Sequence, residues 1–451
     1  MGGAAEGAGY APAVNEDRPT RTLLLLSTHF YPAPTVAAVR WTEFCRHLPE
    51  HGWRVVVLSR YYGVAAEEGD LAQTVSPHVE VRYLNRPMDD QPRGGPGEGS
   101  FGSGGQDAGA ARGGLRERAR RLVMEVGFVP DPSVVFWRRA HARLIEEARR
   151  ARPDVIAATI PPWGKGPAAV RLAREVGAPL VMDRRDPLII DERYGPYGAK
   201  RLRARAYERF DRLCHTAADL TVHAIPTEHR WARLRYPEAR RRMRELTNGF
   251  PPDMLDGGVE PIGDAHGRRS VRVVGAMGGA EMLTLGRAVR ALRDAGEDVS
   301  LTLVGKPPGS SGAIRGLLGD RVEIVGRVEH RRALGYVLGA DVLVNFVSGS
   351  RRGSFLLSTK LFEYAAAGKP VVEVNPSRSD RFFVRRLPGV LVLRDPGEGE
   401  LAGAIGRCLR GEGVPTEAAR RRVIGEHAWP AKAARVAGWL DDLAAGGEVR
   451  P

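Results

Sequence analysis

Short runs of apolar residues alternate with longer amphipathic segments along most of the chain. The first two runs, at residues 22–27 and 54–59, are continuous and have the length of β-strands. Between them, Trp41, Phe44 and Leu48 recur at helical spacing. A continuous apolar run is typical of a strand that is covered on both faces of a parallel sheet. The pattern therefore predicts a β-loop-α-β unit at the start of an α/β fold.

The same alternation continues through both halves of the chain. In the first half we expect further strands at 79–84, 154–159, 179–183 and 219–224, with helices at 133–151, after Gly166 and at 200–215. In the second half we expect strands at 271–275, 300–304, 322–325, 342–346, 370–374 and 390–393. This order of elements predicts two Rossmann-like, doubly wound α/β domains that face a central cleft.

Segments without an apolar period mark the limits of these domains. Residues 1–20 are small and polar and are expected to form a disordered tail, and the glycine-rich stretch 91–114 is expected to be a flexible surface insert. The turn-rich sequence TNGFPP separates the two halves. We therefore expect an N-terminal domain over 21–247, a C-terminal domain over 248–426, and a final helix in 427–451 that can pack back on the N-terminal domain.

The composition is that of a globular protein. Of 451 residues, 43% are hydrophobic, and no apolar run approaches the ~20 residues that span a bilayer. The chain shows no signal peptide, and Cys45, Cys214 and Cys408 form no disulfide framework, so we expect a cytoplasmic location. The net charge of +14 suits an anionic partner. Peripheral contact with the inner face of an anionic membrane stays open, whereas the scattered arginines lack the interleaved aromatic residues typical of nucleic-acid binding.

The most informative stretch is SFLLSTKLFEYAAAGKPVVE at residues 354–373. Ser358 or Thr359 can cap the start of a helix by accepting a hydrogen bond from a free backbone N–H. Gly368 can end the helix in a left-handed conformation. The stretch therefore predicts a helix over 359–367, followed by a buried strand.

Lys360 and Glu363 lie three residues apart in the first turn of this helix and share one face. The free amides and the helix dipole attract a phosphate group, to which Lys360 adds a positive charge. Glu363 can accept hydrogen bonds from ribose or sugar hydroxyls. The pair therefore indicates a nucleotide-sugar site, and the plainer alternative is a solvated surface ion pair.

These segments resemble glycosyltransferases of the GT-B fold, and within them the family 4 of retaining enzymes that use a sugar nucleotide. The likeness covers nearly the whole chain, and its most specific parts are NGFPPD and STKLFEYAAAGKPVV. Its further elements are the proline-containing loop at 31–34, Arg40, LPEHGWRVVVLS and the DRRDP sequence at 183–187.

The resemblance implies the transfer of a sugar from a nucleotide-diphosphate sugar to a hydroxyl acceptor, without a metal or another cofactor. The acceptor would belong to a polysaccharide, a glycolipid or a metabolite, and a lipid-linked acceptor stays open. Glu363 would contact the nucleotide ribose. The backbone at the helix start, near Ser358 and Thr359, would hold the diphosphate.

The chain departs from the family pattern at three positions. Phe355 stands where the family has the first of two glutamates, so one contact with the donor sugar is missing. Ala276 and Met282 stand near the positions of the family's Arg and Lys. Other cations must then neutralise the diphosphate. The candidates each follow a strand end or begin a helix: Lys306, Arg327 and Lys360.

Three residues of the first half are candidates for the catalytic, acceptor-side chemistry. Arg185 aligns with a histidine that many relatives carry, and a guanidinium can bind negative charge that develops on the departing phosphate. Asp186 could position an acceptor hydroxyl. His29, in the loop after the first strand, is a further candidate, although a lone loop histidine is more often structural.

Three other functions remain to be compared with this one. A dinucleotide-dependent oxidoreductase would need a glycine-rich turn in VRVVGAMGGA, but Met277 and Ala280 break the fingerprint. A noncatalytic GT-B protein would explain Phe355, Ala276 and Met282. A nucleotide-sugar 2-epimerase shares the architecture and would need no acceptor.

Overall fold

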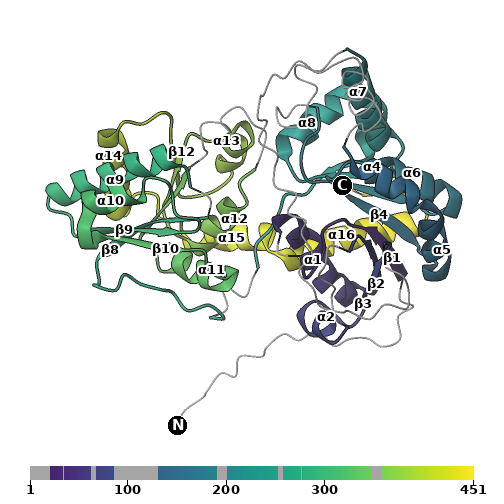
Figure 1. The fold of residues 1–451 in the computed structure, drawn as a ribbon, viewed down its shortest axis with the longest axis horizontal. Coiled ribbons are helices and arrows are strands. Elements are labelled where there is room, and N and C mark those ends of the chain that lie inside the picture. The colour runs from purple at the N-terminus through teal and green to yellow at the C-terminus, as the bar shows by residue number, and fades with distance from the viewer. Residues whose placement is uncertain are drawn as a thin grey trace, which may run out of the picture.

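The computed structural model describes residues 21–33, 35–61, 68–85, 131–189, 201–251, 257–275, 277–346 and 357–450. These residues form two parallel β-sheets, each covered by helices (Figure 1). The predicted α/β class with two Rossmann-like units is therefore confirmed. The expected tail at 1–20, the expected insert at 91–114, Ala276 and Phe355 lie outside the described residues.

The first Rossmann-like unit contains a seven-stranded sheet in the order β3-β2-β1-β4-β5-β6-β7. Its strands are β1 (Arg21–Leu26), β2 (Trp53–Ser59), β3 (Val79–Tyr83), β4 (Val155–Ile160), β5 (Leu180–Arg184), β6 (Leu220–His223) and β7 (Met243–Glu245). Its helices are α1 (Val36–His47), α2 (Glu68–Thr74), α4 (Ser133–Arg139), α5 (His141–Ala151), α6 (Lys165–Val176), α7 (Arg201–Thr216) and α8 (Pro226–Arg235). The single helix expected over 133–151 is two helices, with a break at Ala140.

The apolar runs of β1 and β2 are continuous because both faces of the sheet are covered. Leu23 and Leu25 belong to the core that also contains Trp41 of α1. Leu24 and Leu26 belong to the opposite core, beneath α5 and α6. Successive side chains of a strand point to opposite faces, so the central residues of both strands, at 23–26 and 55–58, are all apolar.

The second Rossmann-like unit contains a six-stranded sheet in the order β10-β9-β8-β11-β12-β13. Its strands are β8 (Arg269–Val274), β9 (Val299–Val304), β10 (Val322–Gly326), β11 (Val342–Phe346), β12 (Val371–Val374) and β13 (Val390–Leu393). Its helices are α9 (Gly279–Asp294), α10 (Ser311–Leu318), α11 (His330–Leu338), α12 (Lys360–Ala367), α13 (Arg378–Val384), α14 (Glu398–Leu409) and α15 (Glu417–His427).

The chain crosses between the two units twice, in neighbouring segments. Phe250 follows the first sheet and pairs with Ala428, which follows α15. After the second crossing, α16 (Trp429–Ala444) packs against α1 (Figure 1). Trp429 and Trp439 of this helix enter the core of the first unit. The domain limits at residues 247 and 427 stay predictions.

The carboxyl edges of the two sheets meet at the starts of two helices. Thr227 lies in the first turn of α8, which follows β6, and Ser379 lies in the first turn of α13, which follows β12. Their hydroxyl oxygens are 2.6 Å apart. Ligands of open α/β sheets bind outside the carboxyl ends of the strands, so the loops that carry the candidate residues lie at the appropriate edges.

Candidate functional site in the second unit and its counterpart in the first

Three neighbouring strands of the second sheet end in glycine. Gly275, Gly305 and Gly326 follow or close β8, β9 and β10 and have φ angles of 111°, 137° and 83°. A Cβ atom on Gly305 would overlap the carbonyl oxygen of Gly275, so no other residue fits there without a shift of the backbone. The glycines leave the strand ends without side chains, and a ligand can approach the backbone closely. We call these three residues the glycine rim.

Lys360 lies over Gly275, the first residue of the glycine rim. A Cβ atom built on Gly275 would be 2.9 Å from Cδ and 3.4 Å from Nζ of Lys360. Lys360 is the first residue of α12, and Gly368 ends this helix with a left-handed φ of 69°, as predicted. Thr359 occupies the capping position, but its side chain does not form the expected capping hydrogen bond. The start of α12 and the ammonium group of Lys360 are thus held at the end of β8.

Glu363 lies one turn further along α12 and faces His330. Its Oε1 is 3.4 Å from Nε2 of His330, and its side chain is 18% exposed. Burial raises the pKa of Glu363, and the neighbouring His330 and Lys360 oppose this rise. His330 begins α11, just beyond the end of β10. The sequence alone did not single out His330, although it follows a strand end.

Two buried carboxylic acids lie near Lys360 on the inner side of the site. Glu373 of β12 accepts a hydrogen bond from Nδ2 of Asn345 at 2.7 Å, and burial raises its pKa well above the usual value. Asp380 accepts a hydrogen bond from the backbone amide of Ser358 at 2.8 Å. The charge of Lys360 lowers the pKa of both acids against the effect of burial. These two residues therefore support the position of Lys360 and of the loop before it.

The other predicted donor-side cations lie at neighbouring strand ends. Lys306 follows β9 and Arg327 follows β10, and both are exposed. Neither forms an ion pair with another part of the chain that the structure describes. Met282 is fully buried in the core of the second unit, so this side chain belongs to the packing of α9 and not to the site.

In the first unit, Arg185 connects the start of α1 with the loop after β4 at the carboxyl edge of the sheet. Its Nη1 donates to the backbone oxygen of Ala37 at 2.5 Å, and its Nη2 donates to the backbone oxygen of Pro161. The half-buried His29 lies nearby. Burial, followed by the charges of Lys165 and Arg185, lowers the pKa of His29 to about 4. His29 is therefore neutral at neutral pH.

Lys165 is a residue of this edge that the sequence did not reveal. It begins α6, is fully buried, and donates from Nζ to Oγ1 of Thr28 at 2.9 Å. Its Nζ also lies 5.8 Å from the centre of the Trp137 ring. Burial and the charge of Arg185 lower the pKa of Lys165 well below its usual value. In the sequence, Lys165 is a single lysine between two glycines and belongs to no recognisable motif. Its position beside Thr28 is therefore evident only from the fold.

Asp186 lies at the border between this edge and a buried polar network. It is half-buried, and its charge adds to the effect of burial that raises the pKa of Glu228 to about 8. The structure thus brings Arg185 close to His29 and places Asp186 within electrostatic range of α8. The roles of these three residues in catalysis stay predictions.

The second unit matches a known family. Residues 268–410 match the family model described as Glycosyl transferases group 1. The second Rossmann-like unit is a glycosyltransferase group 1 domain. The matched part of this domain includes the glycine rim, Lys360 and Glu363. No match to the chain was found among curated proteins.

Solved structures extend the likeness to both units. Sucrose-phosphate synthase from Thermosynechococcus elongatus is 18% identical, covers 95% of this chain and 100% of its own, and superposes with a TM-score of 0.58. HepE of Anabaena, in complex with UDP and glucose, is 14% identical, with coverages of 94% and 100% and a TM-score of 0.56. A glycosyltransferase from Rickettsia africae is 11% identical, with coverages of 94% and 99% and a TM-score of 0.60. The glycosyltransferase group 1 domain is therefore one half of a complete GT-B fold.

Proposed function

We propose that this protein transfers a sugar from a nucleotide-diphosphate sugar to a hydroxyl acceptor, with retention of the anomeric configuration. The observation that carries the proposal is the position of Lys360 over Gly275 within the glycosyltransferase group 1 domain. A cation, a helix start and strand ends without side chains coincide there. This combination suits a diphosphate, which needs positive charge and close access to backbone amides.

The donor would lie along the carboxyl edge of the second sheet. The amides at the start of α12 and Lys360 would hold the diphosphate, with Lys306 and Arg327 close to its outer oxygens. Glu363 would accept hydrogen bonds from the ribose hydroxyls and exchange its contact with His330 for them. Positive charge beside the diphosphate accelerates the reaction most when the bond between sugar and phosphate breaks.

The acceptor would lie against the carboxyl edge of the first sheet. Arg185 would add positive potential toward the departing phosphate, and Asp186 would orient the acceptor hydroxyl. The neutral ring of His29 can accept a hydrogen bond from that hydroxyl. These roles require no metal and no further cofactor.

A binding screen followed by product analysis tests this proposal. UDP is the first nucleotide to test because HepE was solved with it, and GDP and TDP nucleotides and their sugars follow. A ligand at a hundred times its Kd should raise stability by ~2.7 kcal/mol. An active transferase releases nucleoside diphosphate only in step with a glycosylated acceptor. A free epimerised sugar nucleotide would favour the 2-epimerase, and binding without turnover would favour the noncatalytic protein.

Contact with an anionic membrane is a second proposal about the same protein. Among the described residues, no helix has the length and apolar character needed to cross a bilayer. Arg205, Arg209 and Arg212 are exposed along α7 and could bind lipid phosphates from the cytoplasmic side. Sedimentation with anionic vesicles should fall with added salt, and equal binding to neutral vesicles would contradict the proposal.

A further inference from the structure

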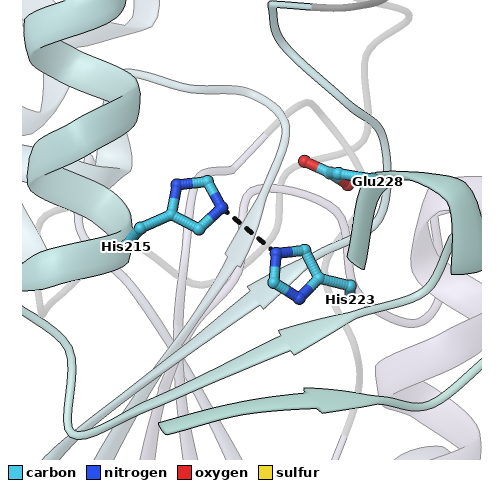
Figure 2. A group of neighbouring side chains, drawn as sticks. All are labelled: His215, His223 and Glu228. Carbon is cyan, nitrogen blue, oxygen red and sulfur yellow. Dashed lines mark hydrogen bonds between the residues drawn. The ribbon is translucent and has the colours of Figure 1, made fainter. Parts of the chain in front are cut away.

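A cluster of two histidines and one glutamate lies inside the first unit, away from the glycine rim. His215 comes from the last turn of α7, His223 ends β6, and Glu228 lies in the first turn of α8. All three side chains are buried, and one nitrogen or oxygen atom from each lies within 4.8 Å of the other two. Figure 2 shows the two rings meeting at their Nε2 atoms, with the carboxylate of Glu228 beside them.

The hydrogen bonds of His215 fix which of its nitrogens can bind a cation. Its Nδ1 lies 2.8 Å from the backbone oxygen of Asp211. A carbonyl oxygen only accepts, so Nδ1 carries the proton and Nε2 presents a lone pair. That lone pair points to Nε2 of His223 at 3.1 Å. An imidazole binds a metal ion through such a lone pair.

The carboxylate of Glu228 helps to decide whether a proton or a metal cation lies between His215 and His223. Its Oε1 accepts from Nε of Arg184 at 2.8 Å, but its Oε2 is buried and has no hydrogen-bond partner. A proton between the two rings would satisfy the histidines and would leave Oε2 without a partner. A bound cation would take a lone pair from Oε2 and from one or both histidines. Since a buried polar atom without a partner is costly, a cation that coordinates Oε2 would remove this cost.

The spacing and the surroundings fit a transition-metal ion. Two nitrogen ligands at ~2.0–2.1 Å from a tetrahedral zinc ion lie roughly 3.3 Å apart, close to the separation of the two Nε2 atoms. The carbonyl of Asp211 orients His215, and Arg184 orients Glu228, as outer partners of metal ligands commonly do. The carboxylate of Asp211 also pairs with Arg184 at 2.6 Å and offsets its charge. Oε2 of Glu228 is thereby left for the cation, which displaces any proton from this acid as it binds.

We propose that His215, His223 and Glu228 bind one divalent transition-metal ion, with zinc as the preferred occupant. Two imidazole nitrogens and one carboxylate oxygen suit zinc, whereas magnesium and calcium prefer oxygen ligands alone. The ion joins α7, β6 and α8. Since Thr227 of α8 is next to Glu228 and contacts Ser379, the ion also stabilises the place where the two sheets meet. Its role is structural, and sugar transfer does not depend on it for chemistry.

Metal content and metal-dependent stability test this site without any activity assay. The full-length protein is unfolded in a chelator, refolded, and titrated with Zn²⁺ and with Co²⁺. We expect about one ion per chain by elemental analysis, a higher unfolding temperature with Zn²⁺, and the visible absorption of Co²⁺ with nitrogen and oxygen ligands. Glu228→Gln preserves the shape of the side chain and should weaken Zn²⁺ binding by more than about tenfold. His223→Ala should do the same.

The control is His266→Ala, because His266 is exposed in a loop of the second unit. This variant should bind the ion like the wild type. Circular dichroism of each variant establishes that it has folded. The proposal fails if the refolded wild type binds no ion and gains no stability from Zn²⁺, Co²⁺ or Mn²⁺. It also fails if folded Glu228→Gln and His223→Ala bind Zn²⁺ as tightly as His266→Ala.

Discussion

Arg40 and Asp183 form a buried ion pair that connects α1 with β5. Nε of Arg40 donates to Oδ1 of Asp183 at 3.0 Å, and both side chains are 2% exposed. The same guanidinium donates to the backbone oxygens of Leu246 and Thr247, where the chain leaves the first sheet. The arginine that the family resemblance singled out therefore fixes the first crossing between the two units.

Replacement of Arg40 by methionine should destabilise the protein strongly. The variant leaves the carboxylate of Asp183 buried without its ionic partner, which costs about 3 to 5 kcal/mol in comparable pairs. Urea unfolding followed by circular dichroism measures the difference. Arg171→Met is the control, because Arg171 pairs with Glu175 on an exposed helix face and should leave the free energy of unfolding nearly unchanged. Similar losses in both variants would contradict a structural role for Arg40.

Replacement of Gly275 by alanine should slow sugar transfer through Lys360. The new Cβ would crowd Cδ of Lys360 and push its side chain away from the end of β8. We expect turnover to fall by about a hundredfold or more, because loss of one preorganised group that binds developing charge costs ~2.7 to 4 kcal/mol. Lys360→Ala should show the same defect, with a smaller effect on donor affinity.

The matched control for this substitution is Gly296→Ala. Gly296 also has a positive φ, of 92°, but a Cβ there would meet no atom within 4 Å. It therefore shares the backbone strain without the contact with Lys360. If Gly275→Ala and Gly296→Ala transfer sugar at the same rate, Lys360 does not act from the position that the structure shows.

His427 should make the stability of the protein depend on pH. Burial, followed by the charge of Lys432, lowers the pKa of His427 to about 3. Nζ of Lys432 lies 3.3 Å from Nδ1 of His427, so a protonated ring would face a second cation. Between pH 6.5 and 3 the unfolded chain binds a proton that the folded chain does not. Stability should therefore decrease as the pH falls through this window, by up to ~1.4 kcal/mol per unit from this group.

His427→Gln removes this proton and should reduce the pH dependence. Urea unfolding at pH 7 and pH 5 is compared for the wild type, for His427→Gln and for the exposed-site variant His266→Gln. His427→Gln should lose less stability than the wild type between the two pH values, and His266→Gln should behave like the wild type. Equal losses in all three proteins would show that the ring of His427 is not held neutral by its surroundings.

The strands were predictable from the sequence where both faces of the strand are buried, because the apolar residues then form a continuous run. β1 and β2 follow this rule. β7 was missed because its three residues are Met243, Arg244 and Glu245, which show no apolar run. The break between α4 and α5 was missed because it occurs at Ala140, where neither glycine nor proline signals an interruption.

The candidate site was predictable where its residues share one helix or directly follow a predicted strand, as Lys306 and Arg327 do. Lys360 and Glu363 follow from the first turn of α12, whose start and end the local sequence specifies. His330 and Lys165 come close to other candidates through the order of strands in the sheets, and no local pattern encodes that order. Met282 shows the opposite case, because the family position suggested a cation near it and the structure places the side chain in the core.

We propose that the carboxyl edge of the second sheet binds the nucleotide of a sugar donor. Calorimetric titration of the wild type and Glu363→Ala with UDP, GDP and TDP measures this binding, with the exposed-site variant Glu329→Ala as the control. The wild type and Glu329→Ala should bind at least one of these nucleotides with equal affinity. Folded Glu363→Ala should bind it more weakly by roughly 1 to 3 kcal/mol, because a polar group of the ribose loses its partner. Equal binding by Glu363→Ala, or no binding of any nucleotide by the wild type, would contradict the claim.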